Sequence, residues 1–438
     1  MNDIAERLHQ QIAQHDARVG IIGLGYVGVP LALALVEAGF RVLGFDTDDA
    51  KTEALNRGAS YIEHIAAERV HAARDLARLE ATSDLGRLGE ADAVLICVPT
   101  PLDANREPDM TAVRRSTEAV AASLRPGQLV ILESTTYPGT CEELLLPILG
   151  AGGLVCGEQF FLAYSPERED PGNPSFGTRT IPKVVGGVDE VSGDLAEALY
   201  SQAVVETVRV SSAATAEATK LLENIFRAVN IALVNELKLA LEPMGIDIWE
   251  VLTAAETKPF GFMRFDPGPG WGGHCIPIDP FYFAWKARQH GITSRFIELA
   301  GQINLEMPLH VVARLRQALG GAPLAGRRVL LLGLSYKPDV ADPRESPAFE
   351  ILSLLLDEGA EVDYHDPHVL VAPSMRSWKN LPPKRSVPLD AETVASYDGV
   401  ILVTDHAAVD YDAVVRHARL VVDTRGRLPV ASGNVVRA

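Results

Sequence analysis

A glycine-rich segment near the amino terminus restricts the fold of this chain more than any other feature. It has the spacing Gly-X-Gly-X-X-Gly, formed by Gly23, Gly25 and Gly28. It follows a short apolar run at 18–23 and opens a helical pattern at 27–38. In this context the first glycine permits a tight turn, the second lets the backbone approach a pyrophosphate, and the third allows close packing of helix on strand. A turn that merely needs small residues is the alternative, which the flanking strand and helix patterns disfavour.

Asp46 ends a second apolar run at 41–46, which completes a strand, helix and strand in βαβ order. A carboxylate at this place accepts hydrogen bonds from a ribose 2′-hydroxyl and repels a 2′-phosphate. Thr47, Asp48 and Asp49 follow, so no adjacent arginine compensates that repulsion. The sequence therefore predicts NAD rather than NADP as the cofactor.

The βαβ theme occurs twice. Continuous apolar runs typical of parallel strands covered on both faces lie at 91–98, 128–132, 328–333, 361–366 and 397–403. Between them, residues 213–242 form one helical pattern without Gly or Pro, about 45 Å long at 1.5 Å per residue and suited to a dimer surface. We expect an α/β fold with two Rossmann-like doubly wound domains joined by a central helical domain. Their expected bounds are 18–210, 211–310 and 311–438.

Composition excludes several classes of protein. A chain of 438 residues is too long for one small binding module. Its 58 Asp and Glu residues exceed its 40 Lys and Arg residues, and the net charge of -18 disfavours binding to nucleic acid or anionic lipid. No apolar run approaches about 20 residues, and the first residues lack the apolar segment of a signal peptide. We expect a cytoplasmic protein without membrane or nucleic-acid partners.

The second βαβ unit lacks the glycine fingerprint. Its turn reads Gly333-Leu-Ser-Tyr-Lys-Pro338, with Lys337 and then Arg344 in the same loop. The first turn uses glycines to let the backbone approach a ligand, whereas this loop has cationic side chains. They favour a second anionic group, such as a nucleotide diphosphate, held by ion pairs. A solvated basic loop is the alternative.

Cys275 lies in a glycine-rich loop just before a predicted helix at 279–289. Backbone N–H groups at a helix start lower the pKa of a thiol, and the thiolate is the nucleophilic form. The alternative, a buried structural cysteine, is our interpretation of Cys97, Cys141 and Cys156. The cysteines have no CxxC pair and no nearby His at ligand spacing except the adjacent His274, so we expect no metal site.

Lys220 and Asn224 are spaced i, i+4 on the long helical pattern and share one face. They form either a surface patch or, beside an acyl-forming cysteine, a pair of donors to a developing oxyanion. The segment 164–171, which contains Glu167, is either a solvated turn or the carboxylate-bearing edge of an active site.

With these residues in place, the chain resembles the UDP-glucose/GDP-mannose dehydrogenase family from about residue 18 to 427. The matching motifs are GLGYVGVPLA (23–32), YIEHI (61–65), CVPTP (97–101), ESTTYPG (133–139), SPEREDPGN (165–173), EATKLLENIFRAVNI (217–231), GPGWGGHCIPIDP (268–280) and YKPDVADPRES (336–346). The resemblance implies an NAD-dependent, four-electron oxidation of a sugar C6 alcohol to a carboxylate through a cysteine thiohemiacetal and thioester. It also implies a C-terminal UDP-sugar-binding domain and a homodimer or higher homo-oligomer.

The resemblance assigns roles to individual residues. Cys275 matches the nucleophile, Asp279 a carboxylate that assists proton transfer, and Lys220 with Asn224 the oxyanion donors. Glu167 and Thr135 match residues that position substrate and water. Residues implied to bind the cofactor are Gly23, Gly25, Tyr26, Val27, Gly28, Asp46, Pro99, Thr100, Thr135 and Arg344. Residues implied to bind the sugar nucleotide are Glu167, Lys220, Asn224, Arg264, Phe265, Gly272, Gly273, Lys337 and Arg425.

One departure concerns hydrolysis of the thioester. Members that act on UDP-glucose have a second glutamate four residues after the position of Glu167, where this chain has Pro171. Glu169 and Asp170 lie nearby, so the hydrolytic base stays open. The variant motifs are similar to those of members acting on 2-acetamido sugars in bacterial O-antigen or capsule polysaccharide synthesis, which predicts UDP-N-acetylglucosamine as substrate. UDP-N-acetylmannosamine, UDP-N-acetylgalactosamine, UDP-glucose and GDP-mannose stay open as substrates, and a catalytically silent NAD-binding regulator is the alternative from another class.

Overall fold

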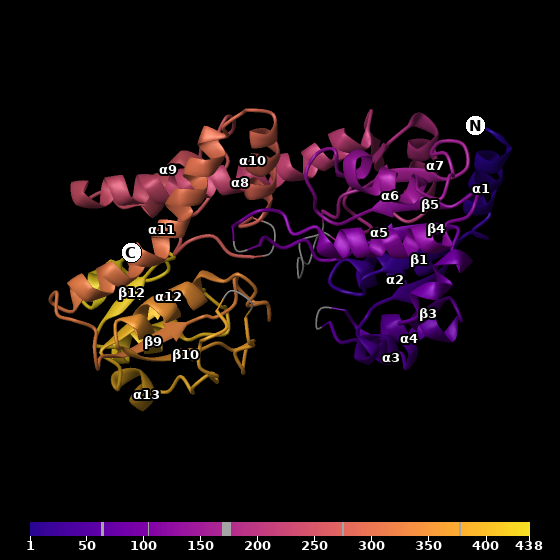
Figure 1. Cartoon of the computed structure of the whole chain (residues 1–438). Helices are drawn as coiled ribbons and strands as arrows, with labels where there is room; N and C mark the ends of the chain where they lie inside the picture. The colour runs from indigo at the N-terminus through magenta and orange to yellow at the C-terminus, as the bar shows by residue number, and fades with distance from the viewer. Residues whose placement is uncertain (63–64, 104, 169–176, 274–275, 376–377) are drawn as a thin grey trace. The chain divides into compact units, whose positions relative to one another are not determined.

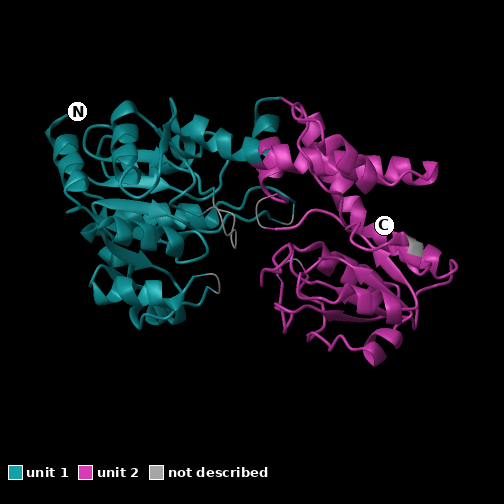
Figure 2. Ribbon diagram, turned by 180° about the vertical axis from the view of Figure 1, so that it is seen from behind, with its two compact units in different colours: residues 1–223, 285–291 teal, residues 224–284, 292–438 magenta. Residues whose placement is uncertain are grey.

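The computed structural model describes residues 1–62, 65–103, 105–168, 177–273, 276–375 and 378–438. The chain divides into two compact units, coloured separately in Figure 2. The first contains residues 1–223 with 285–291, and the second contains 224–284 with 292–438. The three domains expected from the sequence, with bounds near 210 and 310, stay a prediction.

The first unit is built on an eight-stranded sheet of order β3-β2-β1-β4-β5-β6-β7-β8. Its strands are β1 (Arg18–Ile22), β2 (Arg41–Phe45), β3 (Leu79–Thr82), β4 (Ala93–Ile96), β5 (Leu129–Leu132), β6 (Phe161–Tyr164), β7 (Lys183–Gly187) and β8 (Thr207–Arg209). The neighbouring strands are parallel except β6 and β7, which are antiparallel. The predicted strands and doubly wound sheet are confirmed, although the apolar runs did not predict the reversed direction of β7.

Helices cover both faces of this sheet. They are α1 (Asp3–Ala13), α2 (Gly28–Ala38), α3 (Asp49–Asn56), α4 (Ala67–Asp75), α5 (Thr111–Ser123), α6 (Leu146–Gly150) and α7 (Glu190–Tyr200), with a π-helical turn at Cys141–Leu145 before α6. Along β4, Ala93 and Leu95 belong to a core shared with α1, α2 and α7, whereas Val94 and Ile96 belong to a core shared with α5 and α6. Successive side chains of a buried strand thus fill opposite cores, which explains its continuous apolar sequence.

The long predicted helix is α8 (Ala213–Leu241), which has 29 residues and continues as a short 3-10 turn, Glu242–Met244. The boundary between the two units falls within it, after Glu223. The remaining helices of this region are α9 (Ile248–Glu256), α10 (Asp279–Gln289) and α11 (Arg295–Ala318). The bounds of α10 are those predicted from the sequence. No helix among the described residues is long and apolar enough to cross a membrane.

The second unit contains a five-stranded parallel sheet of order β10-β9-β11-β12-β13. Its strands are β9 (Arg328–Leu332), β10 (Glu361–His365), β11 (Gly399–Leu402), β12 (Val421–Asp423) and β13 (Val435–Arg437), with helices α12 (Pro347–Asp357), α13 (Ala391–Ala395) and α14 (Tyr411–His417). They occupy the orange-to-yellow part of the chain in Figure 1. The predicted second Rossmann-like half is therefore confirmed.

Candidate active site

The glycine fingerprint forms a turn whose three glycines meet three different requirements. Gly23 has a φ of 96°, and a Cβ there would lie 2.4 Å from the carbonyl oxygen of Cys97. A Cβ on Gly28 would lie 1.9 Å from the carbonyl oxygen of Gly23. A Cβ on Gly25 would have no described protein atom within 4 Å. Backbone carbonyl groups, one from the turn and one from the residue after β4, therefore enclose two of the glycines, whereas the third is open, which fits the approach of a pyrophosphate.

The start of α2 fits an anionic ligand. Val27 is the N-cap and has no side-chain acceptor for the first N–H groups of the helix. The hydroxyl of Tyr61, in the YIEHI motif, donates a 2.5 Å hydrogen bond to the carbonyl oxygen of Leu24 and so braces the turn from outside. Tyr26 is exposed beside it. Tyr61 belongs to a motif that carries the family resemblance, but the sequence did not predict this hydrogen bond.

Asp46 lies beside the same turn. Its carboxylate accepts the N–H of Leu24 at 2.9 Å and that of Asp48 at 3.0 Å. The Nζ of Lys51, on α3, lies 3.2 Å from it. A carboxylate offers about four acceptor positions, and these contacts use three. Lys51 lies beyond the residues next to Asp46 in the sequence, so this cation was not predicted.

Two loops at the carboxyl ends of β4 and β5 are joined by Ser134. Its hydroxyl accepts the N–H of Val98 at 2.9 Å and donates to the Val98 carbonyl at 2.8 Å. The structure thus brings the loop of Pro99 and Thr100 together with the loop of Thr135, as the cofactor assignments require. Thr100 is buried, Pro99 is exposed and Thr135 is half-buried.

Glu217, in the first half of α8, holds the loop that contains the ESTTYPG motif (133–139). Its carboxylate accepts the N–H of Gly139 at 2.5 Å and that of Cys141 at 3.0 Å. Burial raises the pKa of Glu217 to about 7, against the opposing effect of these two hydrogen bonds. A buried acid therefore ties the helix that carries Lys220 to the loop that carries Thr135.

Glu167 and Lys220 lie together in the first unit. The Lys220 ammonium, almost buried, donates a 2.5 Å hydrogen bond to the carbonyl oxygen of Glu167. The next residue, Arg168, lies 2.6 Å from Glu223 on the same helix and donates to the Pro182 carbonyl at 2.7 Å. The segment after β6 is thus docked on α8, which favours its interpretation as the edge of a site over a solvated turn.

Asn224 and Asp279 lie together in the second unit. The side-chain amide of Asn224 donates to the carboxylate of Asp279, and Arg227 donates to the amide oxygen of Asn224. Asn224 and Asp279 are fully buried. Arg227 was missed by the sequence analysis, although its i, i+3 spacing from Asn224 is a signal for this contact. Cys275, with His274, Glu169, Asp170 and Pro171, lies outside the described residues.

The glycine loop that precedes Cys275 contacts the second nucleotide-binding candidate. A Cβ on Gly272 or Gly273 would lie 3.0 Å from the side chain of Tyr336, which precedes Lys337. A Cβ on Gly268 would lie 2.8 Å from the Arg425 guanidinium. Arg425 and Tyr336, the neighbour of Lys337, therefore both pack against this loop.

Two predicted arginines have carboxylate partners that lie near them in the sequence. Arg344 forms a bidentate pair with Asp342, at 2.8 Å from Nε to Oδ1 and 2.6 Å from Nη2 to Oδ2. Arg264 lies 2.7 Å from Glu256 and 3.0 Å from Asp266. Phe265 stacks edge-to-face on Phe226 of α8, with ring centroids 5.7 Å apart. The roles assigned to these residues stay predictions, with partners that the sequence did not indicate.

The carboxylate that matches Asp46 in the second half is used internally. Asp366 follows β10 and accepts the N–H groups of Leu334 at 2.7 Å and Ser335 at 3.0 Å, and His406 lies 3.1 Å away. Although burial opposes it, the hydrogen bond from His406 and those from the backbone hold the pKa of Asp366 well below its usual range. The other oxygen of Asp366 accepts the N–H groups of His368 at 2.8 Å and Val369 at 2.9 Å, so Asp366 has no acceptor position left for a ribose, whereas Asp46 has one.

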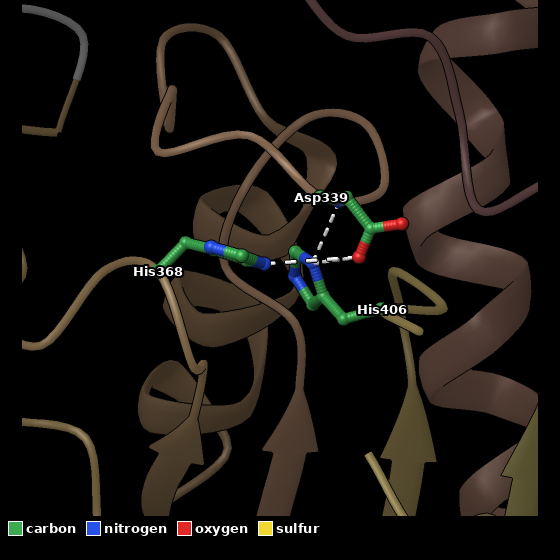
Figure 3. Close-up of side chains that lie close together, drawn as sticks. All are labelled: Asp339, His368 and His406. Atoms are coloured by element: carbon green, nitrogen blue, oxygen red, sulfur yellow. Dashed lines mark hydrogen bonds and ion pairs between the residues drawn. The ribbon is translucent and has the colours of Figure 1, made fainter. Parts of the chain in front are cut away.

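Asp339, His368 and His406 converge at the ends of these strands, as Figure 3 shows, with ligand atoms close enough to suggest a metal site. However, the backbone N–H of Asp339 donates to Nδ1 of His406 at 3.0 Å. Nε2 then carries the proton and donates to Asp366, so neither ring nitrogen of His406 has a lone pair for a cation. The three residues therefore do not offer three free ligand atoms to a metal ion.

The described cysteines are unsuited to nucleophilic chemistry. Burial raises the pKa of Cys97 and Cys141 well above the ordinary thiol value, and it raises that of Cys156 to about 12. All three are free thiols. Their structural interpretation agrees with these environments.

Three family models match the chain in succession. They are the UDP-glucose/GDP-mannose dehydrogenase family NAD binding domain at 17–204, the central domain at 214–306 and the UDP binding domain at 330–429. Together they cover most of the chain, and the first and third correspond to the two sheets described above.

Individual relatives share both sequence and fold with the chain. It is 37% identical to the UDP-N-acetyl-D-glucosamine 6-dehydrogenase of Pseudomonas aeruginosa, over 90% of this chain and 91% of that protein. It is 32% identical to the UDP-N-acetyl-D-mannosamine dehydrogenase of Pyrococcus horikoshii, over 93% and 95%. The solved UDP-D-ManNAc dehydrogenase structure from Pyrococcus horikoshii superposes with a TM-score of 0.86 at 30% identity, covering 96% of this chain and 98% of that one.

Proposed function

The chain belongs to the UDP-glucose/GDP-mannose dehydrogenase family, and from this premise we propose that it oxidises the C6 hydroxyl of UDP-N-acetylglucosamine to a carboxylate. The cofactor is NAD, and the substrate class is a UDP-sugar. The observation that carries the proposal is the hydrogen bond between Asn224 and Asp279, two residues from separate motifs that the proposed chemistry requires side by side.

The residues that would hold NAD are those of the glycine turn, with Asp46 toward the adenosine ribose and Thr100 and Thr135 beyond the ends of β4 and β5. NAD, when bound, supplies a hydride acceptor, and oxidation of an alcohol to an acid consumes about two NAD and one water per sugar.

Cys275 would take up the aldehyde, which forms when the C6 alcohol loses its first hydride and passes its hydroxyl proton to Asp279. Its thiolate sulfur bonds to C6, and the carbonyl oxygen becomes an oxyanion that takes a proton. Loss of the second hydride and that proton leaves a thioester, in which C6 is at the oxidation level of the acid. Asp279 would accept and return the proton, held in place by the amide of Asn224.

Lys220 and Asn224 would stabilise the oxyanion. An ammonium has three donors, and Lys220 uses one on the carbonyl of Glu167, so donors are left for the substrate. Asn224 uses one amide N–H on Asp279, while Arg227 occupies its oxygen, which fixes the direction of the second N–H.

Water would then hydrolyse the thioester, with departure of the Cys275 thiolate. Because Pro171 replaces the second glutamate, Glu167 is the described acid that we assign as base, with Thr135 helping to position the water. The tethering of Glu167 to α8 through Lys220 supports this assignment.

The assignment of a 2-acetamido sugar as substrate is supported by the relatives and not by the geometry of the site. The Pseudomonas aeruginosa relative supports the gluco epimer, and the Pyrococcus horikoshii relative supports UDP-N-acetylmannosamine as a second candidate. Inversion at one carbon changes only a few hydrogen bonds in a pocket.

We also propose that the chain forms a homodimer through α8. Phe226, Leu233 and Leu237 are 45%, 50% and 41% exposed. At about 100° per residue they lie within about 40° of arc, forming an apolar stripe that a second copy would cover.

The proposal is tested by incubating the purified protein with NAD and each of the UDP-sugars, and with GDP-mannose, and by measuring NADH and acid formed. We expect turnover with UDP-N-acetylglucosamine and about two NADH per acid. Cys275→Ser should still bind NAD and sugar but lose turnover to the acid by at least about 10³-fold. Full acid production by that variant, or one NADH per product, would show that the thioester route is wrong.

A further inference from the structure

A buried lysine behind Glu167 has no part in the roles assigned above. Lys183 is the first residue of β7, and its side chain is 4% exposed. Its Nζ lies 2.8 Å from the carboxylate of Glu133, whose side chain is 0% exposed, and 3.7 Å from the carboxylate of Glu167. The same Nζ donates to the carbonyl oxygen of Pro166 at 3.3 Å. One ammonium therefore contacts the Glu167 carboxylate and the backbone just before it.

The position of this ammonium is fixed from behind. The hydroxyl of Tyr200, on α7, donates to the second carboxylate oxygen of Glu133. The Lys183 Nζ also lies 4.9 Å from the centre of the Tyr200 ring. Because all three side chains are buried, Lys183 cannot exchange these partners for water.

The charges in this cluster are unequal. Two carboxylates face one ammonium, and Glu133 alone would neutralise it. The side chain of Glu167 is 13% exposed, so it is the acid of the pair that is nearer to solvent. Although burial opposes it, the charges of Glu133 and Glu167 raise the pKa of Lys183 above its ordinary value, so the group stays protonated. A cation about 4 Å from a carboxylate attracts it, so the ammonium restricts the position of that side chain.

We propose that Lys183 is a positioning residue for the reaction, which holds the Glu167 carboxylate in place after β6, while Glu133 competes for the same ammonium. This inference rests on the proposed function, because it gives Glu167 the role of base in thioester hydrolysis. A base accepts a proton from water only when its carboxylate is correctly placed, so loss of Lys183 should slow hydrolysis without weakening the binding of NAD.

The two carboxylates give this inference a distinctive signature. Removing the lysine charge withdraws the cation from Glu167, so kcat should fall while KM for NAD is kept. Removing the carboxylate of Glu133 leaves the ammonium to Glu167, so most of kcat should be kept. A cluster that only stabilises the fold would lower the melting temperature in both variants and leave kcat of the folded protein unchanged in both.

The test compares Lys183→Met, Lys183→Arg and Glu133→Gln with the wild type, using full-length protein, NAD and UDP-N-acetylglucosamine. We expect kcat about tenfold lower in Lys183→Met, with KM for NAD within about twofold. Lys183→Arg should restore most of kcat, and Glu133→Gln should keep kcat within about threefold of the wild type. If Lys183→Met does not fold, Lys183→Gln takes its place, and an unchanged kcat in a folded variant without the lysine charge would overturn the inference.

Glu167→Gln separates failure of the inference from failure of the proposed function. If it abolishes acid formation while Lys183→Met keeps the wild-type kcat, the role of Lys183 is wrong and the role of Glu167 stands. If Glu167→Gln keeps wild-type turnover, the proposed base is wrong, and the inference is overturned with it.

Discussion

The side-chain amide of Asn224 donates a hydrogen bond to the carboxylate of Asp279, and both side chains are buried. A buried carboxylate needs such a donor, and an amide shared between a carboxylate and a substrate oxygen is held in one orientation. The two residues should therefore act as a unit in catalysis.

Substitution of this pair should give non-additive losses. We expect Asn224→Ala and Asp279→Asn each to lower kcat by about 10²–10³-fold, since each removes an oriented donor or a proton acceptor. The double variant should lose much less than the product of the two factors. Steady-state kinetics with circular dichroism as a folding control would measure this. Strict additivity would show that the hydrogen bond has no role in turnover.

Glu217 should make stability depend on pH. Burial raises its folded-state pKa to about 7, above the unfolded value of 4.5. A raised pKa means that its favourable contribution is complete below about pH 4.5 and is lost as pH rises through about 7. Its full range corresponds to about 3 kcal/mol. Glu217→Gln cannot ionise, so the wild-type melting temperature minus that of the variant should fall between pH 5 and pH 8. A difference independent of pH would contradict this.

Asp46 and Lys51 should tune the choice of cofactor in opposite directions. Loss of the ribose hydrogen bond in Asp46→Ala should raise KM for NAD by about tenfold. The 3.2 Å contact lets Lys51 offset part of the repulsion between Asp46 and a 2′-phosphate. Lys51→Ala should therefore increase the preference for NAD over NADP, by about threefold in kcat/KM. Lys51→Arg, which keeps the charge, is the matched control, and an unchanged preference in Lys51→Ala would exclude this role.

Local patterns predicted most of the fold because strands and helices here have simple signals. The β1 turn, the βαβ units and α10 follow from apolar runs, glycines and a helix start that lie within a few residues of one another. The antiparallel direction of β7 has no such signal, since β7 is buried on both faces whichever way it runs.

The site was predictable as a set of residues but not as a set of contacts. Asn224 and Asp279 come from distant motifs, and only the folded chain shows their hydrogen bond. Lys183 was missed because it lies in an apolar strand where a lysine is unexpected, and its partners come from β5 and the segment after β6. Lys51 and Asp342 were missed because single charged residues, one on α3 and one in the loop before α12, carry no periodic pattern.

The apolar stripe of Phe226, Leu233 and Leu237 on α8 should determine whether the chain forms a dimer. Leu233→Asp combined with Leu237→Asp places two charges on a surface that the proposed dimer would bury, at a cost of several kcal/mol. We expect light scattering coupled to gel filtration to show a change from the mass of two chains to that of one. Leu76→Asp is the matched control, because Leu76 is 64% exposed on the first unit and lies outside the stripe. A dimer that survives the double substitution, or one that dissociates equally in the control, would show that the stripe is not the interface.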